Sequence, residues 1–221
     1  MALQIYGHPV STCTQRVLTV LNEKGIDVNF TLVDIFKGEH KATEYVDRLH
    51  PFGKVPVLVD HESGIQIFES RAIAQYIATK YRGSGTDLSP PESDLKRYAV
   101  YQQALSIELS YFDPLAAVIV WEKIFKAVTG FGSPDEEIVR ITLKRLDSVL
   151  QGYERVLSQS EHLAGDEVTL ADLFHLPYGT LIEEFGFANL LKSYPNVARW
   201  WEGLKARKSW KEVNAKSASR S

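Results

Sequence analysis

Side chains able to do chemistry gather near the start of the chain, in the stretch GHPVSTCTQRVL at residues 7–18. It places Ser11 and Cys13 between a short apolar run and the first helical pattern. A hydroxyl at such a junction can favour a nearby thiolate, because the free N–H groups and positive dipole end of a helix start lie beside it. The same hydroxyl can simply cap the helix. The residues alone favour neither of these two roles of Ser11 over the other.

Cys13 is the second candidate nucleophile in this stretch. A chain with one cysteine among 221 residues forms no internal disulfide, so Cys13 is either a reactive thiol or a packed apolar side chain. Thr12 and Thr14 are interpreted as capping and packing residues. Arg16 either supports the site electrostatically or is a solvated arginine.

The elements that must position these residues start with a strand, a helix and a second strand. LQIYG at residues 3–7 alternates as a strand does, and residues 16–24 carry apolar side chains at helical spacing. Gly25 stands where a glycine commonly ends a helix, and VNFTLV at residues 28–33 predicts the next strand. A β-α-β unit of this kind favours parallel strands joined by a crossover helix.

A hairpin and a further helix complete the first half. VPVLV at residues 55–59 and IQIF at residues 65–68 flank the turn DHESG, and a helical pattern begins at Ser70. A β-α-β, β-β-α order with a proline just before its third strand suggests a thioredoxin-like fold. In that fold the proline is cis, and the backbone beside it is left free to pair with an extended peptide. Val55-Pro56 is the matching pair here.

The chain changes character after this half. Glycine, serine and proline over residues 82–93 are typical of a domain boundary, and the later patterns are helical. We therefore predict an α/β, thioredoxin-like domain over residues 1–82 and an all-helical domain over residues 92–221. The helical stretch around FDP forms two helices or one kinked at Pro114. Thr169 and Asp172 have the spacing of a helix capping box.

Composition narrows the class of function. The 25 basic residues are scattered and balanced by 28 acidic ones, which argues against nucleic-acid binding. No run of 18 uncharged apolar residues exists, so we expect no membrane span, and we read no secretory signal at the N-terminus. The histidines lack H-x-x-H or H-x-x-x-H pairs, so no metal site is expected. A single free cysteine indicates a reducing compartment, so we expect the protein in the cytoplasm.

Several fragments of the chain together resemble glutathione transferases, and they occur in the family's order and spacing. They are GHPVSTCTQRVL, GEHK, HPFGKVPVL, FESRAIAQYIA, FDPLAAVIVWEKIFK and LAGDEVTLADL. The serine, EHK and the pattern FDP…E…FK resemble the phi class. This resemblance implies a thioredoxin-like glutathione domain followed by an all-helical domain. It also implies a homodimer, for which Phe52 on the HPFG loop is the candidate residue entering the partner.

The resemblance also implies roles for individual residues. The hydroxyl of Ser11 would face the sulfur of glutathione, which is the co-substrate. The implied glutathione-binding residues are His40, Lys41, Lys54, Val55, Pro56, Glu69 and Ser70. The family's usual NPFGQVP reads HPFGKVP here, so Lys54 would reach a carboxylate as a flexible cation. The plain alternative for His40, Lys41 and Lys54 is a solvated basic loop.

A second pocket must hold an electrophile. Candidates for its apolar wall are Phe36, Tyr111, Phe112, Leu115, Ile119 and Tyr178. Most aromatic residues at helical spacing are core, so we expect about half of these to line the pocket.

The function implied is conjugation of reduced glutathione to hydrophobic electrophiles, with organic hydroperoxides as a further substrate class. Two rivals stay open. The first is a thiol transferase in which Cys13 forms a mixed disulfide with glutathione. The second is a carrier that binds hydrophobic small molecules and catalyses little.

Overall fold

The computed structural model describes residues 2–218, and these form two compact units. The first contains the described residues of Met1–Ser89 and Arg207–Ser221, and the second is Pro90–Ala206. The first therefore extends past residue 82, where the sequence predicted its end.

A four-stranded mixed sheet forms the centre of the first unit, with the strand order β2-β1-β3-β4. Strand β1 pairs in parallel with β2 and antiparallel with β3, which pairs antiparallel with β4. The strands are β1 (Leu3–Gly7), β2 (Asn29–Leu32), β3 (Val57–Asp60) and β4 (Ile65–Phe68). The predicted β-α-β, β-β-α order and its thioredoxin-like arrangement are confirmed.

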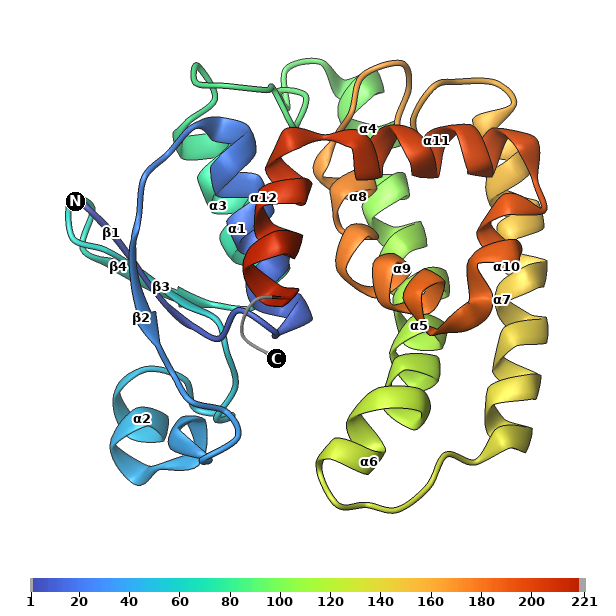
Figure 1. The fold of residues 1–221 in the computed structure, drawn as a ribbon. Coiled ribbons are helices and arrows are strands. Elements are labelled where there is room, and N and C mark those ends of the chain that lie inside the picture. Colours follow the sequence, from blue (N-terminus) through green and yellow to red (C-terminus); the bar gives the residue numbers. More distant parts are fainter. Residues whose placement is uncertain (1, 219–221) are drawn as a thin grey trace. The chain divides into compact units, whose positions relative to one another are not determined.

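Helices cover both faces of this sheet. Their bounds are α1 (Thr12–Lys24), α2 (Thr43–Arg48), α3 (Ser70–Lys80) and α12 (Lys208–Ala218). Figure 1 shows α1 and α3 together on one face, where the apolar residues of both helices are buried. The other face is covered by α2, whose Tyr45 packs with Val57 and Tyr6. Gly25 ends α1 with φ 63°, as its position predicts.

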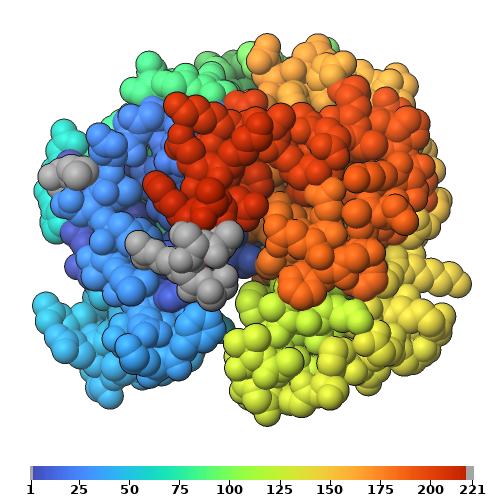
Figure 2. Space-filling model, in the orientation of Figure 1, coloured from blue at the N-terminus to red at the C-terminus, as the bar shows by residue number. Residues whose placement is uncertain are grey.

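Helix α12 belongs to the first unit, which corrects the predicted helical domain of residues 92–221. It packs on α1, and Figure 2 shows its red surface against the blue surface of the first unit. Polar contacts secure it, because Glu23 accepts hydrogen bonds from Arg207 Nε at 2.6 Å and from Ser209 Oγ. An amphipathic pattern predicts a helix but not which unit its apolar face covers.

The second unit is all-helical, as predicted. Its helices are α4 (Leu95–Ile107), α5 (Asp113–Val120), α6 (Lys126–Val128), α7 (Glu136–Leu157), α8 (Leu170–Leu173), α9 (Leu176–Ile182), α10 (Ala188–Lys192) and α11 (Pro195–Ala206). The π-helical turns Glu108–Phe112 and Trp121–Phe125 join α4, α5 and α6. By length and composition alone, the continuous helix Leu95–Val128 could cross a membrane. It packs against α7, α8 and α9, as the core helix of a bundle does.

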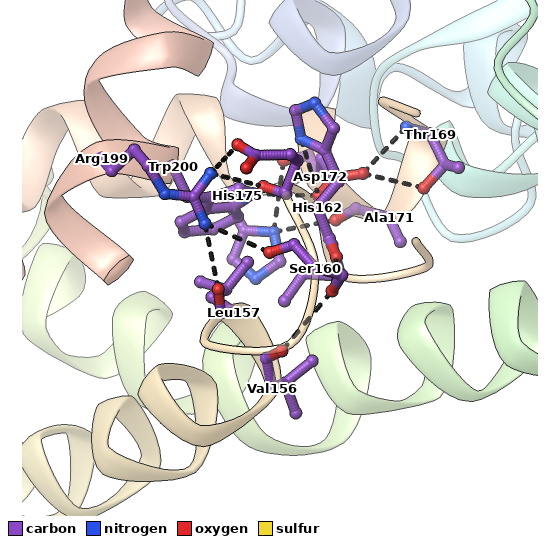
Figure 3. A network of polar contacts seen from close by, with 12 residues as sticks. Val156, Leu157, Ser160, His162, Thr169, Ala171, Asp172, His175, Arg199 and Trp200 are labelled. Atoms are coloured by element: carbon purple, nitrogen blue, oxygen red, sulfur yellow. Dashed lines mark hydrogen bonds and ion pairs between the residues drawn. The ribbon is translucent and has the colours of Figure 1, made fainter. Parts of the chain in front are cut away.

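Asp172 at the start of α8 organises the second unit (Figure 3). Its buried carboxylate accepts hydrogen bonds from the Thr169 N–H at 2.8 Å, the Leu163 N–H at 3.0 Å and Trp200 Nε1 at 2.9 Å. The predicted capping box of Thr169 and Asp172 is confirmed, and it also joins α8 to α11.

Candidate active site

Strand register brings the predicted site residues of the first unit to one edge of its sheet. Tyr6 pairs with Val57, and Val57 pairs with Phe68. Gly7 and Glu69 directly follow Tyr6 and Phe68, and Pro56 directly precedes Val57. The loops that meet the sheet at these three residues therefore start side by side. These loops lead to Ser11, to Val55 and to Ser70.

Ser11 is the N-cap of α1, and the residue is half-buried. Its Oγ accepts a hydrogen bond from the Thr14 N–H at 3.3 Å, so the capping role considered from the sequence is real. A hydroxyl that accepts one hydrogen bond keeps its own hydrogen for a further acceptor. Ser11 can therefore cap α1 and donate to an anion at the same time.

The neighbours of Ser11 hold the loop before α1. The ring of His8 meets that of Phe36 edge to face, with centroids 5.3 Å apart, which places exposed Phe36 beside the loop of the candidate nucleophile. Gln15 Nε2 donates to the Pro9 carbonyl and to Ser217 Oγ, each at 3.0 Å. Gln15 and His8 were not predicted from the sequence.

Ser70 opens α3 and is buried, whereas Glu69 before it is exposed. Glu69 has φ 72°, which is unusual for a residue other than glycine and is typical of functional sites. Arg16 donates a hydrogen bond from Nη1 to Ser70 Oγ at 2.9 Å. Arg16 is 1% exposed, so its interpretation as a solvated arginine is wrong.

The basic residues of the site come from two segments that touch. One is the 3₁₀ turn Glu39–Lys41, and the other is the loop before β3. A Cβ added at Gly53 would lie 2.8 Å from the His40 carbonyl oxygen, so glycine permits this close approach. Lys41 Nζ donates to the Phe52 carbonyl at 3.3 Å. The structure thus brings together His40, Lys41 and Lys54.

Tyr45 anchors the same loop from α2, since its hydroxyl donates to the Lys54 carbonyl at 2.8 Å. Burial raises the pKa of Tyr45 to about 12, so this hydroxyl stays protonated and keeps the hydrogen bond. The side chain of Lys54 remains exposed. Lys54, which stands where the family usually has glutamine, is therefore held by its backbone carbonyl, and its side chain is exposed.

His40 and the two lysines of this basic cluster differ in their charge. Burial, and after it the charges of Lys41 and Lys54, lower the pKa of His40. His40 is therefore mostly a neutral hydrogen-bond donor near pH 7, whereas the two lysines supply charge. A carboxylate bound among them would favour the protonated form of His40.

His50, the other departure from the family's pattern, is the first residue of the HPFG loop, and its side chain is buried. Its ring centroid lies 4.5 Å from that of Phe68, and its Nδ1 accepts from the Phe52 N–H at 3.3 Å. His50 therefore shapes the loop, and Phe52 projects from it with 68% of its surface exposed.

The predicted electrophile residues of the second unit divide into core and surface. Phe112 and Ile119 are only 2% and 1% exposed, and Leu115 is also buried. Phe112 packs on His175 with centroids 4.5 Å apart. These three side chains belong to the core of the helical bundle, and their place in a pocket wall stays a prediction. Tyr111 is 56% exposed and Tyr178 half-buried, so these two keep surface for a ligand.

Within residues 2–218, no group of three or more His, Cys, Asp or Glu side chains is placed to hold a metal ion. The Val55-Pro56 bond is cis, as the sequence pattern predicts. The site of the first unit therefore offers a hydroxyl at a helix start, a second helix start with a buried serine, and a cationic loop. Such a set suits an extended peptide with a carboxylate at each end and an anion between them.

Family models match both halves of the chain. Residues 1–79 match the glutathione S-transferase N-terminal domain, and residues 111–208 match the glutathione S-transferase C-terminal domain. The glutathione S-transferase PM239X14 of Arabidopsis thaliana is 45% identical over 91% of this chain and 90% of its own. The chain belongs to the glutathione S-transferase family. Its resemblance to the phi class is confirmed by relatives with F designations.

Solved transferases share the fold over nearly the whole chain. Glutathione transferase F7 of Populus trichocarpa aligns with a TM-score of 0.91 and 40% identity, over 97% of this chain and 98% of its own. Maize glutathione S-transferase I, solved with an atrazine glutathione conjugate, aligns with a TM-score of 0.90 and 31% identity over 100% of both chains.

Proposed function

We propose that this transferase conjugates reduced glutathione to hydrophobic electrophiles, with Ser11 stabilising the glutathione thiolate. The observation that carries the proposal is the convergence of the loops to Ser11, Val55 and Ser70 at one sheet edge. The maize relative solved with a glutathione conjugate supports the same chemistry.

Each part of the tripeptide has a matching group. The γ-glutamyl carboxylate suits the Ser70 hydroxyl and the N–H groups at the start of α3, and the amino group suits Glu69. The cysteinyl backbone can pair with Val55 beside the cis proline. The glycyl carboxylate suits the cluster of Lys41, Lys54 and His40. The thiol between them then faces Ser11.

In the reaction, the thiol proton leaves to solvent and the sulfur forms a bond to the electrophilic carbon. For a chlorinated aromatic substrate, the carbon–chlorine bond breaks and chloride leaves with its electron pair. The Ser11 hydroxyl donates a hydrogen bond to the thiolate before attack, and the first N–H groups of α1 add the field of the helix start.

The magnitude of this activation is limited. Lowering a thiol pKa from about 8.5 by about two units raises the thiolate fraction at pH 7 about 25-fold. With a Brønsted slope of about 0.45, the intrinsic nucleophilicity falls about eightfold, so the net gain is about threefold. Most of the acceleration must therefore come from holding the thiolate and the electrophile together.

We further propose that the protein is a cytoplasmic homodimer. The exposed ring of Phe52 supports the dimer, and the free Cys13 fits a reducing compartment. Organic hydroperoxides are a further substrate class for the same thiolate, which would attack the peroxide oxygen, break the O–O bond and release the alcohol. The glutathione sulfenic acid so formed would react with a second glutathione to give glutathione disulfide and water.

Substitution at Ser11 and Cys13 tests the mechanism. With glutathione saturating and pH fixed, we expect Ser11→Ala to lose most conjugation of a chlorodinitrobenzene substrate. Cys13→Ala should keep it, because Cys13 lies two residues further along α1. Ser11→Cys should gain disulfide exchange, since a thiol then stands where the hydroxyl was.

The reverse pattern would contradict the mechanism. Activity lost in Cys13→Ala and kept in Ser11→Ala would establish the thiol transferase. Binding to a glutathione-affinity column with no turnover of electrophile would instead establish the carrier.

A further inference from the structure

Two loops of the first unit start side by side where the strands β1 and β2 end. The two strands are parallel, and parallel strands leave a sheet at the same edge. The Gly7 carbonyl at the end of β1 accepts a hydrogen bond at 2.9 Å from the N–H of Val33, which directly follows β2. The loop that leads to Ser11 therefore starts beside the loop that carries Phe36.

His8 shapes the first of these loops. Its carbonyl accepts a hydrogen bond from the Ser11 N–H at 3.0 Å, and its ring Nδ1 accepts one from the Val10 N–H at 3.3 Å. Both N–H groups belong to the turn through which the chain enters α1. The ring of His8 is therefore an acceptor inside the turn that sets the place of the Ser11 hydroxyl.

The same ring contacts the second loop. It meets the ring of Phe36 edge to face, with centroids 5.3 Å apart. The backbone of Phe36 is held separately, because the Asp34 carboxylate accepts hydrogen bonds from the N–H groups of Phe36 at 3.0 Å and of Lys37 at 3.1 Å. His8 is buried, whereas the side chain of Phe36 is 63% exposed. The Phe36 ring thus rests on a fixed neighbour and keeps surface for a ligand.

We propose that His8 is a positioning residue for both reactants. Its ring orients Phe36 as part of the aromatic wall for the electrophile, and its Nδ1 holds the turn that presents Ser11 to the glutathione sulfur. The inference rests on the proposed conjugation of glutathione. Because one buried ring makes both contacts, it fixes the aromatic wall relative to the hydroxyl, and holding the two reactants together supplies most of the expected acceleration.

A plain alternative is that His8 only closes the turn before α1. Two substitutions separate its two contacts. His8→Asn removes the ring but keeps an acceptor for the Val10 N–H, because an asparagine side chain commonly accepts a hydrogen bond from the N–H two residues further on. His8→Phe keeps an aromatic ring against Phe36 but has no acceptor for that N–H.

Steady-state conjugation of a chlorodinitrobenzene substrate, with a KM for each reactant and a pH profile, makes the test. For His8→Asn we expect the KM of the electrophile to rise about two- to tenfold, the effect of one edge-to-face ring contact, with the KM of glutathione and the pH profile unchanged. For His8→Phe we expect an unchanged electrophile KM, but the thiolate of bound glutathione should form about half a pH unit higher, because a loosened turn weakens the Ser11 hydrogen bond. His61→Asn, at an exposed histidine of the same unit, is the control and should match wild type.

A double variant checks that His8 acts on the electrophile through Phe36. Phe36→Leu alone should raise the KM of the electrophile by a similar factor. Adding His8→Asn should raise that KM little further, because the ring that His8 orients is already gone. Effects of the two substitutions that multiply in full would overturn the proposal.

Folding is monitored by circular dichroism and thermal unfolding. If His8→Asn does not fold, His8→Ser is measured in its place, because a serine hydroxyl can also accept from the N–H two residues further on. Equal effects of this substitution on both reactants, or on neither, overturn the proposal, and so does a His8→Phe variant with the pH profile of wild type. A wild type that neither binds nor conjugates glutathione would instead overturn the proposed function.

Discussion

At the scale of single residues, the candidate site uses hydroxyl groups that already accept a hydrogen bond from the protein. Ser11 accepts from the Thr14 N–H, and Ser70 accepts from Arg16. In both cases the oxygen is oriented and the hydrogen remains for a ligand. This preorganisation lowers the entropy that a ligand must otherwise offset to order the side chain.

The charge of Asp60, at the end of β3, is coupled to the stability of the fold. Burial alone would raise its pKa, but hydrogen bonds from Lys80 and from the Tyr76 hydroxyl at 2.6 Å outweigh burial and hold the pKa well below its usual range. Because the pKa is lower in the folded state, Asp60 stabilises the fold above about pH 4. That contribution is lost as the pH falls toward the folded-state value.

We therefore predict that Asp60→Asn lowers the free energy of unfolding by about 2 kcal/mol at pH 7. The difference from wild type should shrink between about pH 5 and pH 2, because the unfolded wild type then takes up a proton at Asp60 and the folded state does not. Urea unfolding across this pH range measures it. Asp47→Asn, at an exposed aspartate of α2, is the control. A difference that grows on acidification would contradict the linkage.

At the scale of elements, a buried carboxylate of α1 is one of the groups that hold α12. The side chain of Glu23 is 6% exposed and accepts hydrogen bonds from Arg207 Nη2 and Thr86 Oγ1, each at 2.7 Å. Burial alone would raise the pKa of Glu23, yet these hydrogen bonds leave it lowered. A charged Glu23 therefore joins the end of α1, the segment after α3 and the start of α12.

We predict that Glu23→Gln destabilises the first unit by about 2 kcal/mol and speeds amide exchange in α12, because a neutral amide cannot match the bidentate contact. Hydrogen exchange with mass spectrometry measures the second effect. Glu44→Gln, which breaks an exposed pair with Arg48, should cost about 0.5 kcal/mol or less. Unchanged exchange in α12 with Glu23→Gln would show that the remaining contacts hold the helix without the Glu23 carboxylate.

The helices and strands with a local sequence pattern were predicted, whereas contacts between distant residues were not. Period-2 and period-3.6 patterns predicted the strands, α1 and α3, because these patterns depend on neighbouring residues alone. The placement of α12 and the burial of Phe112 and Arg16 were not predicted. Each depends on a partner far along the chain, such as Ser70 for Arg16, and a local pattern does not name its partner.

The contact of the candidate residues with glutathione stays a prediction. The glutathione-binding positions were carried by family motifs, and strand register brings their loops to one edge. The sequence could not separate residues of the apolar wall from residues of the core, because both share the same helical spacing. Gln15 and His8 were not predicted, because their partners include Ser217 and Phe36, which lie far along the chain and leave no local sequence pattern.

At the scale of the whole molecule, the expected homodimer centres on Phe52. An aromatic ring with 68% of its surface exposed, braced by His50 and Phe68, is preorganised to enter a pocket of a second copy. A two-fold dimer uses such a residue twice, so one substitution acts on both halves of the interface.

We predict that Phe52→Ser shifts the protein to monomers, because each ring would remove about 150 Å² of surface from water, or about 4 kcal/mol at 25 cal/mol per Å². Sedimentation at micromolar concentration measures this shift against the 24.9 kDa monomer mass. Phe131→Ser is the matched control, because Phe131 is 71% exposed but lies in the helical unit. The control should remain dimeric. A monomeric wild type, or a dimer that survives Phe52→Ser unchanged, would exclude this role for Phe52, since two equivalent rings cannot both be lost from a real interface without weakening it.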